Sequence, residues 1–243
     1  MSPTFTRIPD EYFNITYGGG EALTGIFGYE RVTLANITVN RQQIAVVQNA
    51  SWFGNGISSG ILGLAFPSLT SAFEGNNPAV DTTSDASDGV EYSPILTTIF
   101  TQGEAAPLFT LVLERGNVTS TLAIGGLPPG LPTYKPDNFA SAQIQILQVT
   151  SEPLTATQYS FYTIYPDGFV FKGANETTYS SGTWSNPLKG PPKGWKPMDK
   201  SIDTITTDFP MIIDSGTSLM YLPRNLTYTL LALYDPPATR IPL

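Results

Sequence analysis

The sequence contains neither cysteine nor histidine. Without cysteine there is no disulfide framework, no thiolate nucleophile and no zinc site of the thiolate type. Without histidine the Ser-His-Asp and Cys-His arrangements of nucleophilic catalysis are excluded, and the commonest transition-metal ligand is missing. Any acid–base chemistry of this chain must therefore rest on carboxylates.

Basic residues are also scarce. The chain has 12 Lys and Arg against 20 Asp and Glu, a formal net charge of −8. Such a chain offers no basic patch that could displace counterions from phosphate. It also lacks the run of roughly 18 apolar residues that a membrane helix requires. We therefore expect neither a nucleic-acid partner nor a membrane-spanning segment.

Six Asn-x-Ser/Thr sequons are candidate glycosylation sites and favour a secreted glycoprotein. They lie at Asn14, Asn36, Asn49, Asn117, Asn175 and Asn225. The first residues, MSPTFTRIPDEYF, lack the apolar segment of a secretory signal, so nothing within the sequence directs export.

Short apolar stretches separated by Gly, Asn and Pro dominate the chain and predict an all-β architecture. Residues 31–39, RVTLANITV, alternate apolar and polar positions on each side of the turn-prone pair Ala35-Asn36. Two helices are expected besides. One covers residues 93–103, with Ser93 as N-cap, and the other covers residues 224–237.

The stretch MIIDSGTSLMYL, residues 211–222, puts a carboxylate at the end of an apolar run that is typical of a buried strand. A turn at Gly216 can bring backbone N–H groups and the hydroxyls of Thr217 and Ser218 around Asp214, and so hold its carboxylate ionised and fixed. An ordinary β-turn with aspartate as the turn residue fits the tetrapeptide by itself equally well.

Three motifs in a fixed order decide between these interpretations. They are FNITYGGGEALTGIFGYERVTL at 13–34, GILGLAFPSL at 60–69 and MIIDSGTSLMYLP at 211–223, with AIGGL at 123–127 before the last. In this order they resemble the pepsin-like aspartic endopeptidases, with the fungal acid proteases as the most similar group. The resemblance implies an all-β fold of two lobes with a cleft between them. Here residues 1–150 would form an incomplete first lobe and residues 151–243 an incomplete second lobe.

The resemblance also implies roles for single residues. Asp214 matches the catalytic aspartate of the second lobe, with Gly216, Thr217 and Ser218 around it. Tyr17 matches the tyrosine of a flap that closes over the substrate, and Gly18, Gly19 and Gly20 would form the flap tip. The implied function is hydrolysis of peptide bonds in proteins at acid pH by two aspartates and an activated water. It needs a polypeptide substrate but no metal or other cofactor. We expect a monomer at full length and an extracellular or vacuolar location.

The partner of Asp214 is missing from the expected place. In the family the first Asp-Thr-Gly-Ser precedes the flap, and the sixteen residues before Tyr17 contain no such motif. Asp81-Thr82-Thr83 lacks the glycine and lies after the flap. We expect a piece of a protease cut at both ends, nearly inactive as given. Two alternatives are a non-catalytic relative that binds peptides or a protein partner, and a homodimer in which two Asp214 turns meet.

Overall fold

A computed structural model of the chain describes residues 2–52, 54, 56–76, 89–114, 120–130, 141–149, 157–166, 168–172, 178–182, 196–197, 210–217, 219–232 and 234. The chain divides into two compact units: Met1–Ser141 with Ile146–Phe161, and Ala142–Gln145 with Tyr162–Leu243. Most of the regular structure is strand, which confirms the all-β prediction. The predicted lobes, 1–150 and 151–243, stay a prediction.

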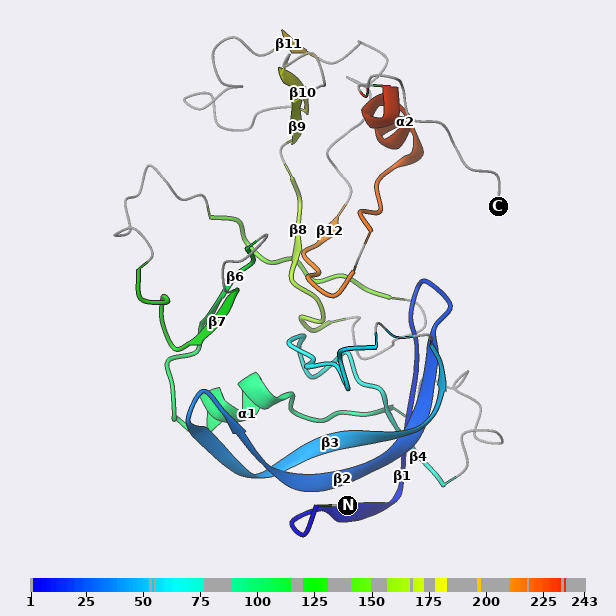
Figure 1. Ribbon diagram of the computed structural model, residues 1–243, viewed down its shortest axis with the longest axis vertical. Coiled ribbons are helices and arrows are strands. Elements are labelled where there is room, and N and C mark those ends of the chain that lie inside the picture. The colour runs from blue at the N-terminus through cyan, green and yellow to red at the C-terminus, as the bar shows by residue number, and fades with distance from the viewer. Residues whose placement is uncertain are drawn as a thin grey trace. The chain divides into compact units, whose positions relative to one another are not determined.

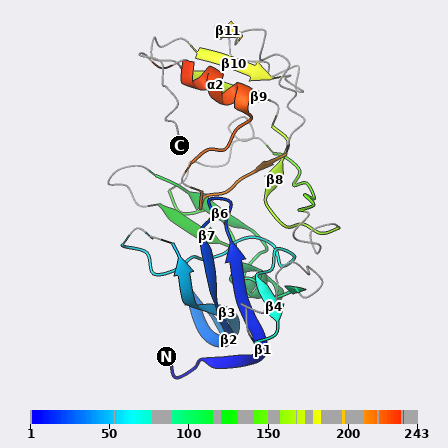
Figure 2. The same ribbon diagram turned by 90° about the vertical axis from the view of Figure 1, so that its right-hand side faces the viewer.

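The first unit is built on a five-stranded antiparallel sheet with the strand order β3-β2-β1-β4-β5 (Figure 1). Its strands are β1 (Thr6–Thr16), β2 (Ala22–Leu34), β3 (Ile37–Ser51), β4 (Ala72–Glu74) and β5 (Gly89–Val90). Figure 2 shows the long strands β1, β2 and β3 side by side. In β2, Leu23, Gly25 and Phe27 are buried and the residues between them less so, the period of two that places alternate side chains on opposite faces.

The turn between β2 and β3 is the predicted Ala35-Asn36 pair. Ala35 has φ 51° and Asn36 has φ 65°. Positive φ at both central residues defines the type I′ turn, whose twist matches that of the strands on either side. This two-residue connection fixes the register of β3 on β2, with Leu34 opposite Ile37 and Thr33 opposite Thr38.

Two clusters of buried side chains hold the first unit together. Phe13, Leu23, Phe27 and Ala72 form one cluster along β1, β2 and β4. The other brings Val39 of β3 against the buried side of α1 (Ile95–Thr101), so the helix anchors the sheet at the end away from the β1–β2 turn (Figure 1).

The predicted helix at 93–103 is confirmed as α1, but Ser93 as its N-cap is wrong. Pro94 occupies the N-cap position, and no side chain caps the helix. Ser93 lies one residue too early, and its carbonyl accepts a hydrogen bond from Gln42 Nε2 at 2.8 Å. Gly103, with φ 73°, follows the helix, where left-handed backbone satisfies the last carbonyls.

The remaining elements are short. The first unit also contains the antiparallel pair β6 (Phe109–Val112) and β7 (Thr121–Ile124). The second unit contains β8 (Thr163–Ile164), β9 (Gly168–Lys172), β10 (Thr178–Gly182), β11 (Lys196–Pro197), β12 (Met211–Ile212) and α2 (Arg224–Ala232). The second predicted helix is thus confirmed, and Leu226 on it is fully buried. Among the described residues, no helix is long and apolar enough to span a bilayer.

Candidate active site

Asp214 lies just after β12, in a turn that engages both of its carboxylate oxygens. Oδ1 accepts a hydrogen bond from the backbone N–H of Gly216 at 2.8 Å. Oδ2 accepts one from Oγ1 of Thr217 at 2.5 Å. The turn therefore orients the carboxylate through two of the predicted groups, while the predicted contact with Ser218 lies outside the described residues. Each oxygen keeps a lone pair for a further partner.

The apolar stretches around this turn are exposed, so the prediction of a buried strand is wrong. Among the described residues around the turn, only Met211 and Ile212 form a strand, paired with Ile164 and Thr163 of β8. The N–H of Ile213 still donates to the carbonyl of Tyr162 at 2.9 Å, but its side chain is 56% exposed. On the other side of the turn, Leu219, Met220 and Tyr221 are 71%, 73% and 74% exposed. The apolar character of these side chains means that burial would be favourable for them. They can be buried, however, only where another apolar surface packs against them.

Tyr17 and the three glycines after it form the turn between β1 and β2. The carbonyl of Tyr17 accepts the N–H of Gly20 at 2.9 Å, and the N–H of Tyr17 donates to the carbonyl of Glu21 at 2.8 Å. Gly20 has φ 92°, a conformation that side-chain-bearing residues rarely adopt. The result is a tight hairpin with an exposed tip, Gly18–Gly20, and a half-buried Tyr17 at its base.

Trp52 is a neighbour of Tyr17 that the sequence analysis did not find. The two ring centroids are 6.1 Å apart and the planes are tilted by 59°. Trp52 follows the end of β3, and Ser51 pairs with Ala22 of β2 next to the hairpin. The register of β3 therefore carries the tryptophan to the tyrosine. Only the strand pairing could have revealed this contact, because 34 residues separate the two rings in sequence.

A second carboxylate, Glu11, is buried in β1 of the first unit. It accepts a hydrogen bond from Nε2 of Gln43. Burial raises the pKa of the Glu11 carboxyl above its ordinary value. Burial likewise raises the pKa of Tyr92; the negative charge of Glu11 adds to that shift, and a hydrogen bond with Ser71 opposes it. An ionised Glu11 is thus unfavourable inside the sheet. We therefore expect this residue to affect the stability of the protein and not its chemistry.

Glu11→Gln should stabilise the protein at neutral pH and leave its stability unchanged at acid pH. The pKa of Glu11 is raised in the folded state. Glu11 therefore contributes its full stabilisation below its unfolded-state pKa, and this stabilisation is lost as pH rises through the folded-state pKa. Glutamine is never charged, and its oxygen can still accept the bond from Gln43. We expect the Tm, measured by circular dichroism, to rise by a few degrees at neutral pH.

Glu30→Gln is the matched control for this prediction. A hydrogen bond from Thr4 lowers the pKa of Glu30, so its contribution is present above the unfolded-state pKa and is lost as pH falls. Glu30 is accessible to solvent, which screens this contribution, so Glu30→Gln should leave the neutral-pH Tm nearly unchanged whereas Glu11→Gln raises it. A Tm change of the same size for Glu11→Gln at acid and at neutral pH would contradict the role of the buried charge.

The predicted site residues fall into two groups, and each lies within one unit. Asp214, Gly216 and Thr217 meet in the second unit, and Tyr17 and Gly18–Gly20 form the hairpin of the first. Three of the sequon asparagines, Asn14, Asn36 and Asn49, belong to the sheet of the first unit or its turns. Ser218, Asn117 and Asn175 lie outside the described residues. Asn225 lies in α2, but its side chain is not among those that the structure describes.

The chain thus combines mostly β structure with an aspartate oriented by an Asp-Ser-Gly-Thr turn. The family described as eukaryotic aspartyl protease matches residues 2–135, more than half of the 243 residues. The chain belongs to the eukaryotic aspartyl protease family, which confirms the resemblance found in the sequence.

Individual relatives match the chain along nearly its whole length. A probable aspartic-type endopeptidase of Aspergillus fumigatus is 33% identical over 241 residues, which cover 97% of this chain and 45% of the relative. Cathepsin E of Mus musculus is 28% identical over 247 residues, 95% of this chain and 53% of the relative. The solved aspartic proteinase of Irpex lacteus is 20% identical with a TM-score of 0.48, over 75% of this chain and 49% of that one. The chain thus spans about half the length of these relatives.

Proposed function

We propose that this chain is part of an aspartic-type endopeptidase that hydrolyses peptide bonds in proteins at acid pH, with Asp214 as one of two catalytic carboxylates. The observation that carries the proposal is the double hydrogen bonding of Asp214 by Gly216 N–H and Thr217 Oγ1. A carboxylate held at both oxygens keeps its orientation when a water molecule and a substrate arrive. Family membership over residues 2–135 supports the same proposal.

The chemistry requires a second carboxylate beside Asp214. Two close carboxyl groups share one proton, as aspartic proteases do as a class, because both cannot be ionised side by side. The ionised group takes a proton from water as the water oxygen bonds to the peptide carbonyl carbon. The protonated group gives its proton to the carbonyl oxygen. Breakdown of this adduct, with a proton passed to the leaving nitrogen, cleaves the C–N bond.

The first unit would supply the flap. The Tyr17–Gly20 hairpin has an exposed glycine tip and a half-buried tyrosine at its base, the form expected of a lid that closes over an extended peptide and excludes water. In this proposal residues 1–150 belong to the first lobe and residues 151–243 to the second. Ser218 is the second hydroxyl residue of the Asp-Ser-Gly-Thr-Ser sequence. Extracellular or vacuolar location accords with hydrolysis at acid pH.

The Asp-Thr/Ser-Gly motif occurs once in the 243 residues, at Asp214. One aspartate cannot be protonated and ionised at the same moment, so we propose that a polypeptide of these residues alone is nearly inactive. The alternative is a non-catalytic relative that binds peptides or a protein partner.

The test compares the natural protein with a polypeptide of these 243 residues. Both are incubated with denatured globin at acid and at neutral pH, and the fragments are identified by mass spectrometry. The natural protein should cleave internal peptide bonds at acid pH, and the 243-residue polypeptide should cleave few or none. Peptide binding by the natural protein without cleavage would instead support the non-catalytic relative. Activity of the shorter chain as a dimer in light scattering would support two Asp214 turns meeting.

A further inference from the structure

The outer strand of the five-stranded sheet is bracketed by two sequons. Among the described residues, β3 pairs only with β2. Asn36 immediately precedes this strand, and Asn49 lies two residues before its end at Ser51.

Asn36 is well placed to carry a bulky group. It occupies the second central position of the type I′ turn with φ 65°, and both Asn36 and Thr38, the hydroxyl residue of its sequon, are exposed. A substituent on Asn36 would project from the hairpin tip into solvent without disturbing a strand pair.

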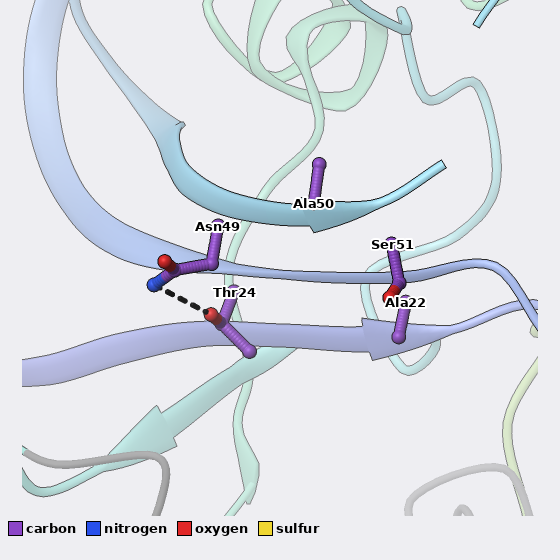
Figure 3. A pocket seen from close by; sticks show the side chains of 5 residues that line it. All are labelled: Ala22, Thr24, Asn49, Ala50 and Ser51. Atoms are coloured by element: carbon purple, nitrogen blue, oxygen red, sulfur yellow. Dashed lines mark hydrogen bonds between the residues drawn. The ribbon is translucent and has the colours of Figure 1, made fainter. Parts of the chain in front are cut away.

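Asn49 is exposed as well, and it stands beside open space. Its Nδ2 donates to Oγ1 of Thr24 on β2 at 3.4 Å (Figure 3). Around it lies a shallow hollow of about 300 Å³, lined by small side chains: Ala22, Thr24, Ala50 and Ser51. An amide nitrogen that has bonded to a sugar keeps one hydrogen, so the bond to Thr24 can persist while the first sugar occupies the hollow.

Asn14 provides an internal contrast. It lies on β1, between β2 and β4, and is half-buried. Its backbone N–H donates to the carbonyl of Ser71 at 3.0 Å. The register places it opposite Thr24, and Thr24 opposite Asn49, so the two asparagines are about 10 Å apart, two strand spacings. Substituents at both positions would crowd over Thr24.

We propose that Asn36 and Asn49 carry N-linked glycans and that Asn14 is unmodified. In the modification the amide nitrogen bonds to C1 of an oligosaccharide as the bond from C1 to the oxygen of a lipid-linked pyrophosphate breaks. The nitrogen releases one proton, and the lipid pyrophosphate leaves with the electron pair. This inference does not depend on the proposed catalytic function.

Peptide mapping of the natural protein, secreted from a host that performs N-glycosylation, tests the sites. Enzymatic removal of the glycans in heavy-oxygen water marks each occupied asparagine as a labelled aspartate. We expect the label at positions 36 and 49 and none at 14. No label at 36 and 49, or an Asn14 occupancy equal to theirs, overturns the assignment.

Secreted variants test each site by intact mass. Asn36→Gln and Asn49→Gln should each remove the mass of one glycan, whereas Asn14→Gln should leave the glycan mass unchanged. Ser51→Ala provides a second route, because it removes the sequon and leaves Asn49 in place. A glycan mass that is unchanged in Asn36→Gln and in Asn49→Gln would overturn the assignment. Proteolytic activity, measured in parallel, reports separately on the proposed function.

Discussion

Asp214→Asn is expected to lower the kcat of the natural protein by roughly 1,000-fold or more. The amide has the same shape as the carboxylate, and its oxygen can still accept one of the two bonds from Gly216 and Thr217. It cannot take a proton from water, however, so the nucleophile is not activated. Peptide binding relies on other contacts, so the change should fall on kcat with KM little altered. Initial rates of cleavage of a peptide substrate at acid pH provide the measurement.

Two further variants distinguish a loss of catalysis from a loss of structure. Thr217→Val removes one hydrogen bond from Asp214 but keeps the ionisable group, so we expect a loss of roughly tenfold, the effect of one bond to a charged acceptor. Glu104→Gln changes an exposed carboxyl of the first unit and should leave the rate unchanged. Asp214 is exposed, so its replacement should not shift the Tm. Full activity of the asparagine variant would contradict the role of Asp214.

Local patterns predicted those parts of the structure that depend on local chemistry. The pair Ala35-Asn36 was predicted to be turn-prone, and both residues adopt the positive φ of a hairpin turn, which asparagine tolerates. The Asp214 turn followed from the same reasoning, since a side-chain oxygen can reach the N–H two residues on. Both features close within four residues, so little else in the fold can override them.

Contacts between distant residues could not be predicted in this way. Glu11 is buried and bonded to Gln43, 32 residues away, only because β1, β2 and β3 lie side by side in one sheet. Trp52 reaches Tyr17 for the same reason. The exposure of Ile213 was missed because apolar sequence records a preference for burial, whereas burial itself requires a facing surface. Ser93 was misplaced as a cap by one residue, the usual scale of error at helix ends.

Phe27→Ala is expected to destabilise the first unit by about 3–5 kcal/mol. The Phe27 side chain is fully buried. Its ring lies 5.7 Å from that of Phe13, edge to face, and 5.2 Å from that of Tyr92. Alanine would leave a cavity bounded by the rings of Phe13 and Tyr92. Phe13 cannot move inward to fill it without breaking the pairing of β1 with β2. A loss of this size is a large fraction of the roughly 5–15 kcal/mol that holds a typical domain folded.

Hydrogen exchange of the amides of β1 and β2 measures this loss within the first unit, which matters because the chain has two units and a single melting curve would mix them. Val47→Ala on β3 is the control: its side chain is 44% exposed, so we expect less than about 0.5 kcal/mol. Phe27→Leu should fall between the two, because it fills part of the cavity. Equal effects of Phe27→Ala and Val47→Ala would mean that the Phe13–Phe27–Tyr92 cluster is not the core that keeps the candidate flap hairpin in register.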